Sequence, residues 1–133
     1  MTVEQAWVRL AAAGGESAAI YMVVHNRSST DDYLLAVETD QAARSEIHET
    51  VIRDGSPTSQ PIPGGLDMPS HGEVVMRPGG FHIMLSNISG SIVPGASLPI
   101  RMIFREAGVI ELSVPVLTET AADPIERHTA HKF

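Results

Sequence analysis

The sequence predicts an all-β protein, specifically an antiparallel β-sandwich, and three observations lead to this fold class. Short segments with alternating or β-branched character recur along the chain. Clusters of turn-forming residues separate these segments. The length of 133 residues is that of one domain. Eight short strands at such spacing are typical of a sandwich or a barrel.

The first half of the chain contains four of the expected strands, at Ala6–Ala11, Ala18–Asn26, Tyr33–Val37 and Ser45–Ile52. Turns are expected at Ser28–Asp32 and Asp54–Pro57, where short polar residues, glycine and proline gather. The best helical candidate is one or two turns around Asp40–Arg44.

The second half contains the other four strands, at Glu73–Arg77, Phe81–Ser86, Ser97–Phe104 and Val109–Val116. Glycine and proline mark turns at Pro63–Gly65 and Arg77–Gly80, and Glu106–Gly108 is the last turn. From about Thr118 onward the sequence becomes polar and irregular. We therefore expect one domain at residues 1–117 and a flexible polar C-terminal tail at residues 118–133.

Composition and charge argue against several classes of protein. The chain has 16 acidic and 9 basic residues and a net charge of -7, whereas nucleic-acid binding requires clustered Lys and Arg. No apolar run approaches the roughly 20 residues of a transmembrane helix. Without cysteine there is no disulfide, thiolate ligand or cysteine nucleophile. The phosphate-loop, His-Glu-x-x-His and Gly-x-Ser-x-Gly motifs are missing, so we do not expect an enzyme.

Two histidines and a methionine occupy strand faces that point away from the expected core. Ile47 on the core face of its strand places His48 on the opposite face. The strand Phe81–Ser86 alternates in the same way, so His82 and Met84 share its non-core face. We expect these side chains at the protein surface, with some exposure to solvent.

The His-x-Met pair has two interpretations. A methionine left outside the core forgoes roughly 1.5–3 kcal/mol of burial free energy. Side by side, His82 and Met84 form a soft pair of donors that suits copper, particularly Cu(I), and His48 could supply a third ligand. Surface histidines without function are the other interpretation. The spacing of these residues and the strand face they occupy leave both interpretations open.

Longer stretches of the chain resemble a known family. They are "AWVRL", "AAIYMVVHN", "EIHETVIRDG", "GGLDMPSHGEVVMRPGGFHIML" and "IRMIFREAGVIELSVPV", which together extend from about Ala6 to Val116. In these stretches the chain is similar to the periplasmic copper chaperones called PCuAC. The resemblance implies a cupredoxin-like, Greek-key β-sandwich. It also implies a site in which two histidines and two methionines bind Cu(I).

Three of the four ligands that the resemblance implies are present, as His48, His82 and Met84. The pattern calls for a second methionine at position 59, where this chain has Ser59. A hydroxyl is a hard, weak donor for Cu(I), so we expect weaker retention of Cu(I) and a shifted preference between the oxidation states, with Cu(I) still favoured over Cu(II).

Four further residues could compensate for the lost thioether. Met68 is expected to be a packing residue and His71 a solvent-facing loop residue. His128 and His131 lie in the expected tail, where they could recruit Cu(II) or have no function.

The resemblance implies a copper(I) carrier of the bacterial cell envelope. Its cargo would go to the copper centre of a haem-copper oxidase, with a Sco-type thiol protein as a further partner. The alternative is a sandwich that has lost strong copper binding and acts in protein interaction or binds another metal. A periplasmic or otherwise exported location rests on the resemblance. The chain begins Met1-Thr2-Val3-Glu4 without a basic, apolar leader, so any export signal has been trimmed or never existed.

Overall fold

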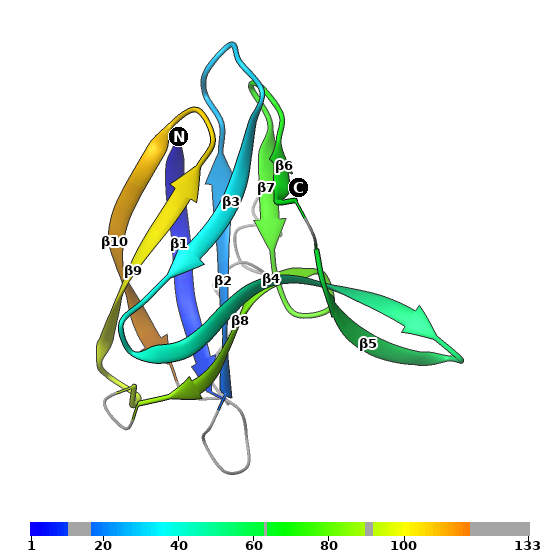
Figure 1. Ribbon diagram of the computed structural model, residues 1–133, viewed down its shortest axis with the longest axis vertical. Coiled ribbons are helices and arrows are strands. Elements are labelled where there is room, and N and C mark those ends of the chain that lie inside the picture. The colour runs from blue at the N-terminus through cyan, green and yellow to red at the C-terminus, as the bar shows by residue number, and fades with distance from the viewer. Residues whose placement is uncertain (11–16, 63, 90–91, 118–133) are drawn as a thin grey trace, which may run out of the picture.

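A computed structural model describes residues 1–10, 17–62, 64–89 and 92–117. Within these ranges the chain forms ten β-strands and no helix, which confirms the all-β prediction (Figure 1). Their bounds are β1 Thr2–Leu10, β2 Ser17–His25, β3 Asp32–Glu38, β4 Ala42–Arg53, β5 Ser56–Pro61, β6 Leu66–Met68, β7 Glu73–Met76, β8 Phe81–Ile88, β9 Ser97–Phe104 and β10 Gly108–Leu117. No helix in the described residues has the length and apolar character needed to cross a membrane.

The strands follow the order β5-β4-β8-β7-β2-β1-β10-β9-β3-β6, with β8 also paired to β2. Most pairings are antiparallel, as predicted, whereas β1–β10 and β7–β8 are parallel. The β1–β10 pairing joins one group of strands, from β5 to β1, to a second group, from β10 to β6. Buried apolar side chains from both groups form one core, which makes the architecture a sandwich.

The predicted helix around Asp40–Arg44 is wrong. Asp40 and Gln41 form a turn, and β4 already begins at Ala42. The Thr39 hydroxyl donates to the Pro99 carbonyl at 2.9 Å and accepts the Gln41 N–H at 3.3 Å, which fixes this turn. Pairing of β4 with β8 then continues back to Ala42, so tertiary contacts override the helix propensity of the alanines.

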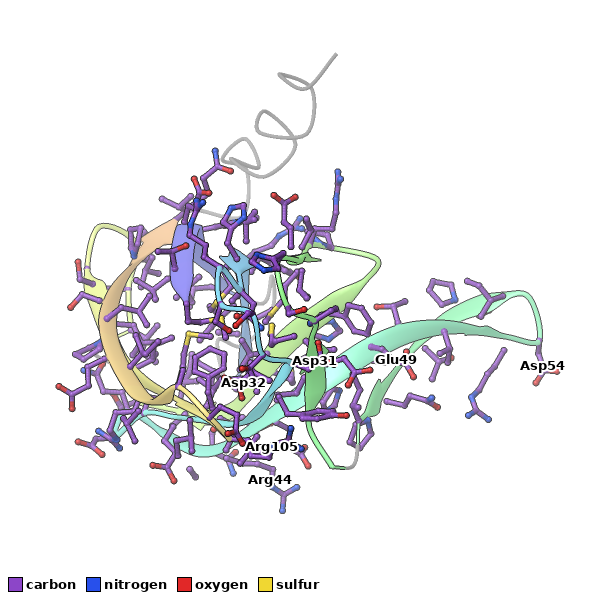
Figure 2. The ribbon with its side chains drawn as sticks, turned by 90° about the horizontal axis from the view of Figure 1, so that it is seen from above. Asp31, Asp32, Arg44, Glu49, Asp54 and Arg105 are labelled. Carbon is purple, nitrogen blue, oxygen red and sulfur yellow. The ribbon has the colours of Figure 1, made fainter. Side chains whose placement is uncertain are left out.

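Two strands were not predicted. β5 contains Pro57 and Pro61, which reduce strand propensity, and it lies at the end of the strand order, where proline is tolerated. β6 has only three residues. β5 forms a hairpin with β4 that projects from the other strands (Figure 1), and Asp54 marks its tip in Figure 2.

β2 carries apolar side chains on both of its faces. Ile20 and Met22 belong to the main core, whereas Tyr21 and Val23 alternate with them and pack with Trp7 in a second, smaller cluster. The rings of Trp7 and Tyr21 are 5.0 Å apart. The face opposite the main core is therefore partly covered by aromatic side chains. His48 and His82 lie on this face.

Candidate metal centre

The pairing of β4 with β8 brings the two histidines together. His48 is the direct partner of His82, and Glu46 is the direct partner of Met84. Direct partners in an antiparallel pair place their side chains on the same face, and residues two apart share that face. The imidazole centroids of His48 and His82 are 5.7 Å apart. The three side chains singled out in the sequence thus gather on one patch of the sheet.

β5 brings Ser59 to the same patch. In the hairpin Ser59 is the direct partner of Thr50, two residues beyond His48 on β4. Its Oγ atom lies 2.6 Å from His48 Nδ1 and 3.1 Å from His82 Nε2. Position 59, where the resemblance calls for a methionine, therefore lies between the two imidazoles.

The turn between β7 and β8 orients His82. The chain reverses at Arg77-Pro78-Gly79-Gly80, and the Gly80 N–H donates to the Arg77 carbonyl at 2.9 Å. Gly79 has a φ of 87°, which glycine adopts without steric cost. The Gly80 carbonyl accepts His82 Nδ1–H at 3.2 Å and Thr50 N–H at 3.1 Å. Because the proton of the neutral ring is at Nδ1, Nε2 keeps its lone pair toward Ser59.

His82 is not at the surface, contrary to the sequence-based expectation. It is 6% exposed, and Met84 is half-buried. The Tyr21 ring centroid lies 6.3 Å from the His82 ring and the His48 ring flanks it too, so His82 joins the aromatic side chains of this face. The error came from assuming that only one face of the sheet is buried.

Burial also affects the protonation of His82. Desolvation of the imidazolium lowers the pKa of His82, because the charged form loses its hydration. The hydrogen bond to Gly80 raises the pKa and the nearby His48 lowers it, and the net change is downward. His82 is therefore biased toward the neutral form, which is the form that binds metal ions.

The donor atoms of the patch differ from those of a metal site built from charged side chains. Among the described residues, no three His, Cys, Asp or Glu side chains are arranged to hold a metal ion. The patch instead combines two imidazole nitrogens with the hydroxyl of Ser59 and the nearby thioether of Met84. Imidazole with thioether favours copper over calcium or magnesium.

The other candidates do not join this patch. Met68 is fully buried in the main core on β6, at the opposite end of the strand order from β5, which fits the packing role expected of it. His71 lies in the loop before β7, where its N–H donates to the Ser28 carbonyl, and it lines a different cavity together with His25. His128 and His131 lie outside the described residues.

Sequence reasoning missed four contributors to the site. Glu46 lies two residues before His48 on the same strand face, but its contact with the His48 ring was not foreseen. Tyr21 and the Gly80 carbonyl carry no sequence signal for a role here, because their positions depend on how β2 and the β7–β8 turn pack against β8. Ser59 was counted as a lost ligand, whereas it contacts both histidines.

Comparisons with known proteins place the chain in a family. A family model described as "Putative lipoprotein LpqE-like" matches residues 1–116. The chain belongs to the LpqE-like family. It is also 29% identical over 114 residues to a curated protein of Leifsonia xyli subsp. xyli (strain CTCB07) described as "Putative lipoprotein Lxx21020", covering 86% of this chain and 68% of that one.

Solved structures share the fold of this LpqE-like chain. The copper-bound PCuAC domain from PmoF2 matches with a TM-score of 0.72 at 24% identity, covering 87% of this chain and 91% of that one. The solution structure of CuI-DR1885 from Deinococcus radiodurans matches with a TM-score of 0.69 at 20% identity, covering 84% and 74%. These matches confirm the β-sandwich that the sequence predicted and the cupredoxin-like fold that the resemblance implied.

Proposed function

We propose that the protein binds copper as cargo at His48, His82 and Met84 and passes it to a partner protein. The observation that carries this proposal is that His48 Nδ1 and His82 Nε2 both lie within hydrogen-bond distance of one atom, Ser59 Oγ. Two ring nitrogens that point at the same position, with a thioether beside them, form a metal-binding site. The copper-bound domain from PmoF2 and the CuI form of DR1885, which share the fold, support copper as the metal.

The donor set defines how copper is held. Two imidazoles and one thioether suit Cu(I) in a three-coordinate arrangement. Ser59 adds an oxygen where a second thioether would bind Cu(I) more strongly. The site therefore retains Cu(I) less tightly than a site with two methionines, and it accepts Cu(II) more readily.

A carrier must also release its cargo, and the two histidines differ in access. His82 is buried next to Tyr21, whereas the His48 side chain, on β4 opposite the last residue of β5, keeps 12% of its surface exposed. A partner's ligands can therefore displace His48 first, while His82 still holds the ion. Replacing ligands one at a time avoids releasing free copper.

The destination and the location rest on the resemblance to PCuAC proteins. The cargo goes to the copper centre of a haem-copper oxidase, with a Sco-type thiol protein as partner. The description of the family and of the Leifsonia protein as lipoproteins supports an exported location in the cell envelope. A carrier role requires no catalysis, in line with the sequence-based prediction.

Titration with Cu(I) against a chromophoric chelator tests this proposal. Replacing His82 by Ala should abolish retention of Cu(I), because it removes the buried ligand. His71→Ala is the matched control, since His71 lines a different cavity and should leave binding unchanged. Unchanged retention by His82→Ala would remove the proposed site.

The oxygen of Ser59 favours a second candidate function, the binding of another metal. A hydroxyl among the donors reduces the advantage of Cu(I) and suits harder ions such as Zn²⁺. Metal analysis after loading with equal amounts of copper and zinc separates the two functions. Stoichiometric copper supports the carrier, whereas stoichiometric zinc supports this alternative, and no metal would leave a module for protein interaction.

A further inference from the structure

Glu46 lies beside the imidazole of His48, on the side away from Ser59. Its Oε1 atom is 3.4 Å from His48 Nε2, whereas His48 Nδ1 faces Ser59 Oγ at 2.6 Å. The Glu46 side chain is 43% exposed and the His48 side chain 12%. The carboxylate thus borders the ring on its solvent side.

The partners of the two rings determine where their protons are. A carboxylate only accepts hydrogen bonds, so His48 Nε2–H donates to Glu46 and Nδ1 keeps a lone pair. In His82 the arrangement is reversed: Nδ1–H donates to the Gly80 carbonyl and Nε2 keeps the lone pair. Both lone pairs consequently point at Ser59 Oγ.

Ser59 cannot satisfy both lone pairs, because a hydroxyl carries one proton. One ring nitrogen can accept that proton, and the other then faces the hydroxyl oxygen. A cation between the two nitrogens, either a proton or a metal ion, satisfies both. The acceptors behind the rings, Glu46 and the Gly80 carbonyl, therefore turn two histidines into a two-nitrogen ligand.

We propose that Glu46 is a positioning residue of the metal site, whose carboxylate holds the His48 ring so that Nδ1 binds the ion. This inference rests on the proposed function. Glu46 acts through His48 and is not itself a ligand, because it contacts the nitrogen that is turned away from Ser59. A carboxylate behind a metal-binding histidine fixes the ring tautomer and increases the basicity of the ligand.

Two measurements on the full chain test this role. The first is Cu(I) affinity, by competition with a chromophoric chelator. The second is the ring tautomer of His48 in the metal-free protein, from its ¹⁵N chemical shifts. The variants are Glu46→Ala, which removes the acceptor, and Glu46→Gln, whose amide oxygen still accepts from Nε2–H. Glu111→Ala is the control for charge, because it removes one exposed carboxylate on β10, which pairs with neither β4 nor β8.

We expect Glu46→Ala to weaken Cu(I) binding by about 10–100-fold and to shift metal-free His48 away from the Nε2–H tautomer. Glu46→Gln should keep the tautomer and recover most of the affinity, and Glu111→Ala should match the wild type. Unchanged affinity in Glu46→Ala, or an Nδ1–H tautomer of His48 in the wild type, overturns the positioning role alone. A wild type that binds no copper overturns the proposed function and this inference with it.

Discussion

Ser59 Oγ lies 2.6 Å from His48 Nδ1, across the β4–β5 hairpin. The two residues belong to neighbouring strands, and the hairpin holds the serine against the imidazole. The same oxygen is 3.1 Å from His82 Nε2, so a single side chain connects both histidines. The identity of residue 59 therefore influences what the site binds.

Replacing Ser59 by Met should tighten Cu(I) binding. The new thioether would start from a backbone position that already faces both imidazoles, and it would complete a set of two nitrogens and two sulfurs. We expect a gain of about tenfold or more, equivalent to about 1.4 kcal/mol. Competition with a Cu(I) chelator measures it.

Thr58→Met is the matched control for this gain. Thr58 is the exposed neighbour of Ser59 on β5, and successive residues of a strand point to opposite faces. The control adds a methionine to the hairpin away from the histidines, so its Cu(I) affinity should not change. An equal gain in both variants would show that the added thioether acts without the two histidines.

Much of the site could be predicted from local patterns, whereas its burial could not. Alternation of apolar residues placed His48, His82 and Met84 on one side of their strands, and the register of β4 with β8 makes them neighbours. The second cluster, around Trp7 and Tyr21, covers the same face and depends on long-range pairing of β1, β2 and β8. A period of two residues cannot distinguish a solvent-facing strand face from one covered by another cluster.

The fold shows the same division between local and long-range information. All eight predicted strands occur, because their apolar periodicity matches the sheet. β5 was missed because its sequence "SPTSQP" contains no aromatic residue and only one β-branched residue. Its pairing with β4 is what holds the segment as a strand. The residue that contacts both histidines therefore lies on a strand with little strand propensity.

Met84→Leu should weaken retention of Cu(I) while leaving the fold intact. The substitution removes the sulfur and keeps a similar volume, so the free energy of unfolding should fall by less than about 1.5 kcal/mol. Cu(I) competition and urea unfolding separate the two effects. Met76→Leu, in the main core, makes the same chemical change away from the site and should leave Cu(I) affinity unchanged. Equal affinities in Met84→Leu and wild type would exclude the thioether from the ligand set.

The lowered pKa of His82 predicts that the metal-free protein loses stability on acidification. Burial lowers the pKa of His82 in the folded state, so the unfolded chain binds the proton more readily. The stability linked to His82 is complete above its ordinary unfolded pKa of about 6.5, and it is lost as the pH falls through the lowered folded value.

Urea unfolding of wild type and His82→Gln between pH 8 and pH 5 measures this linkage, with His71→Gln as the control. The wild type and the control should lose more stability over this range than His82→Gln. The His48 ring faces the His82 ring, so the comparison is made between variants that retain His48. A parallel loss in all three proteins would contradict the prediction.

Asp32 should be the most costly carboxylate to remove from the second group of strands. It is buried, and its side chain accepts the N–H groups of Tyr33 at 2.7 Å, Glu106 at 2.8 Å and Ala107 at 3.0 Å. Figure 2 shows it near Arg105, whose guanidinium lies over the Tyr33 ring. Burial acts to raise the pKa of Asp32, but these hydrogen bonds and Arg105 together hold it below its usual value.

Asp32→Ala removes the acceptor of the Glu106 and Ala107 N–H groups in the β9–β10 turn, and we expect a loss of about 1.5–3 kcal/mol of unfolding free energy. Asp67→Ala, at an exposed position of the neighbouring strand β6, should cost less than about 0.5 kcal/mol. Chemical unfolding at neutral pH compares the two variants.

Because the folded pKa of Asp32 is lowered, its contribution to stability is present above its unfolded pKa and disappears as the pH falls through the folded value. The difference between wild type and Asp32→Ala should therefore shrink in acid, and a difference that stays constant would show that packing, not the carboxylate charge, is responsible.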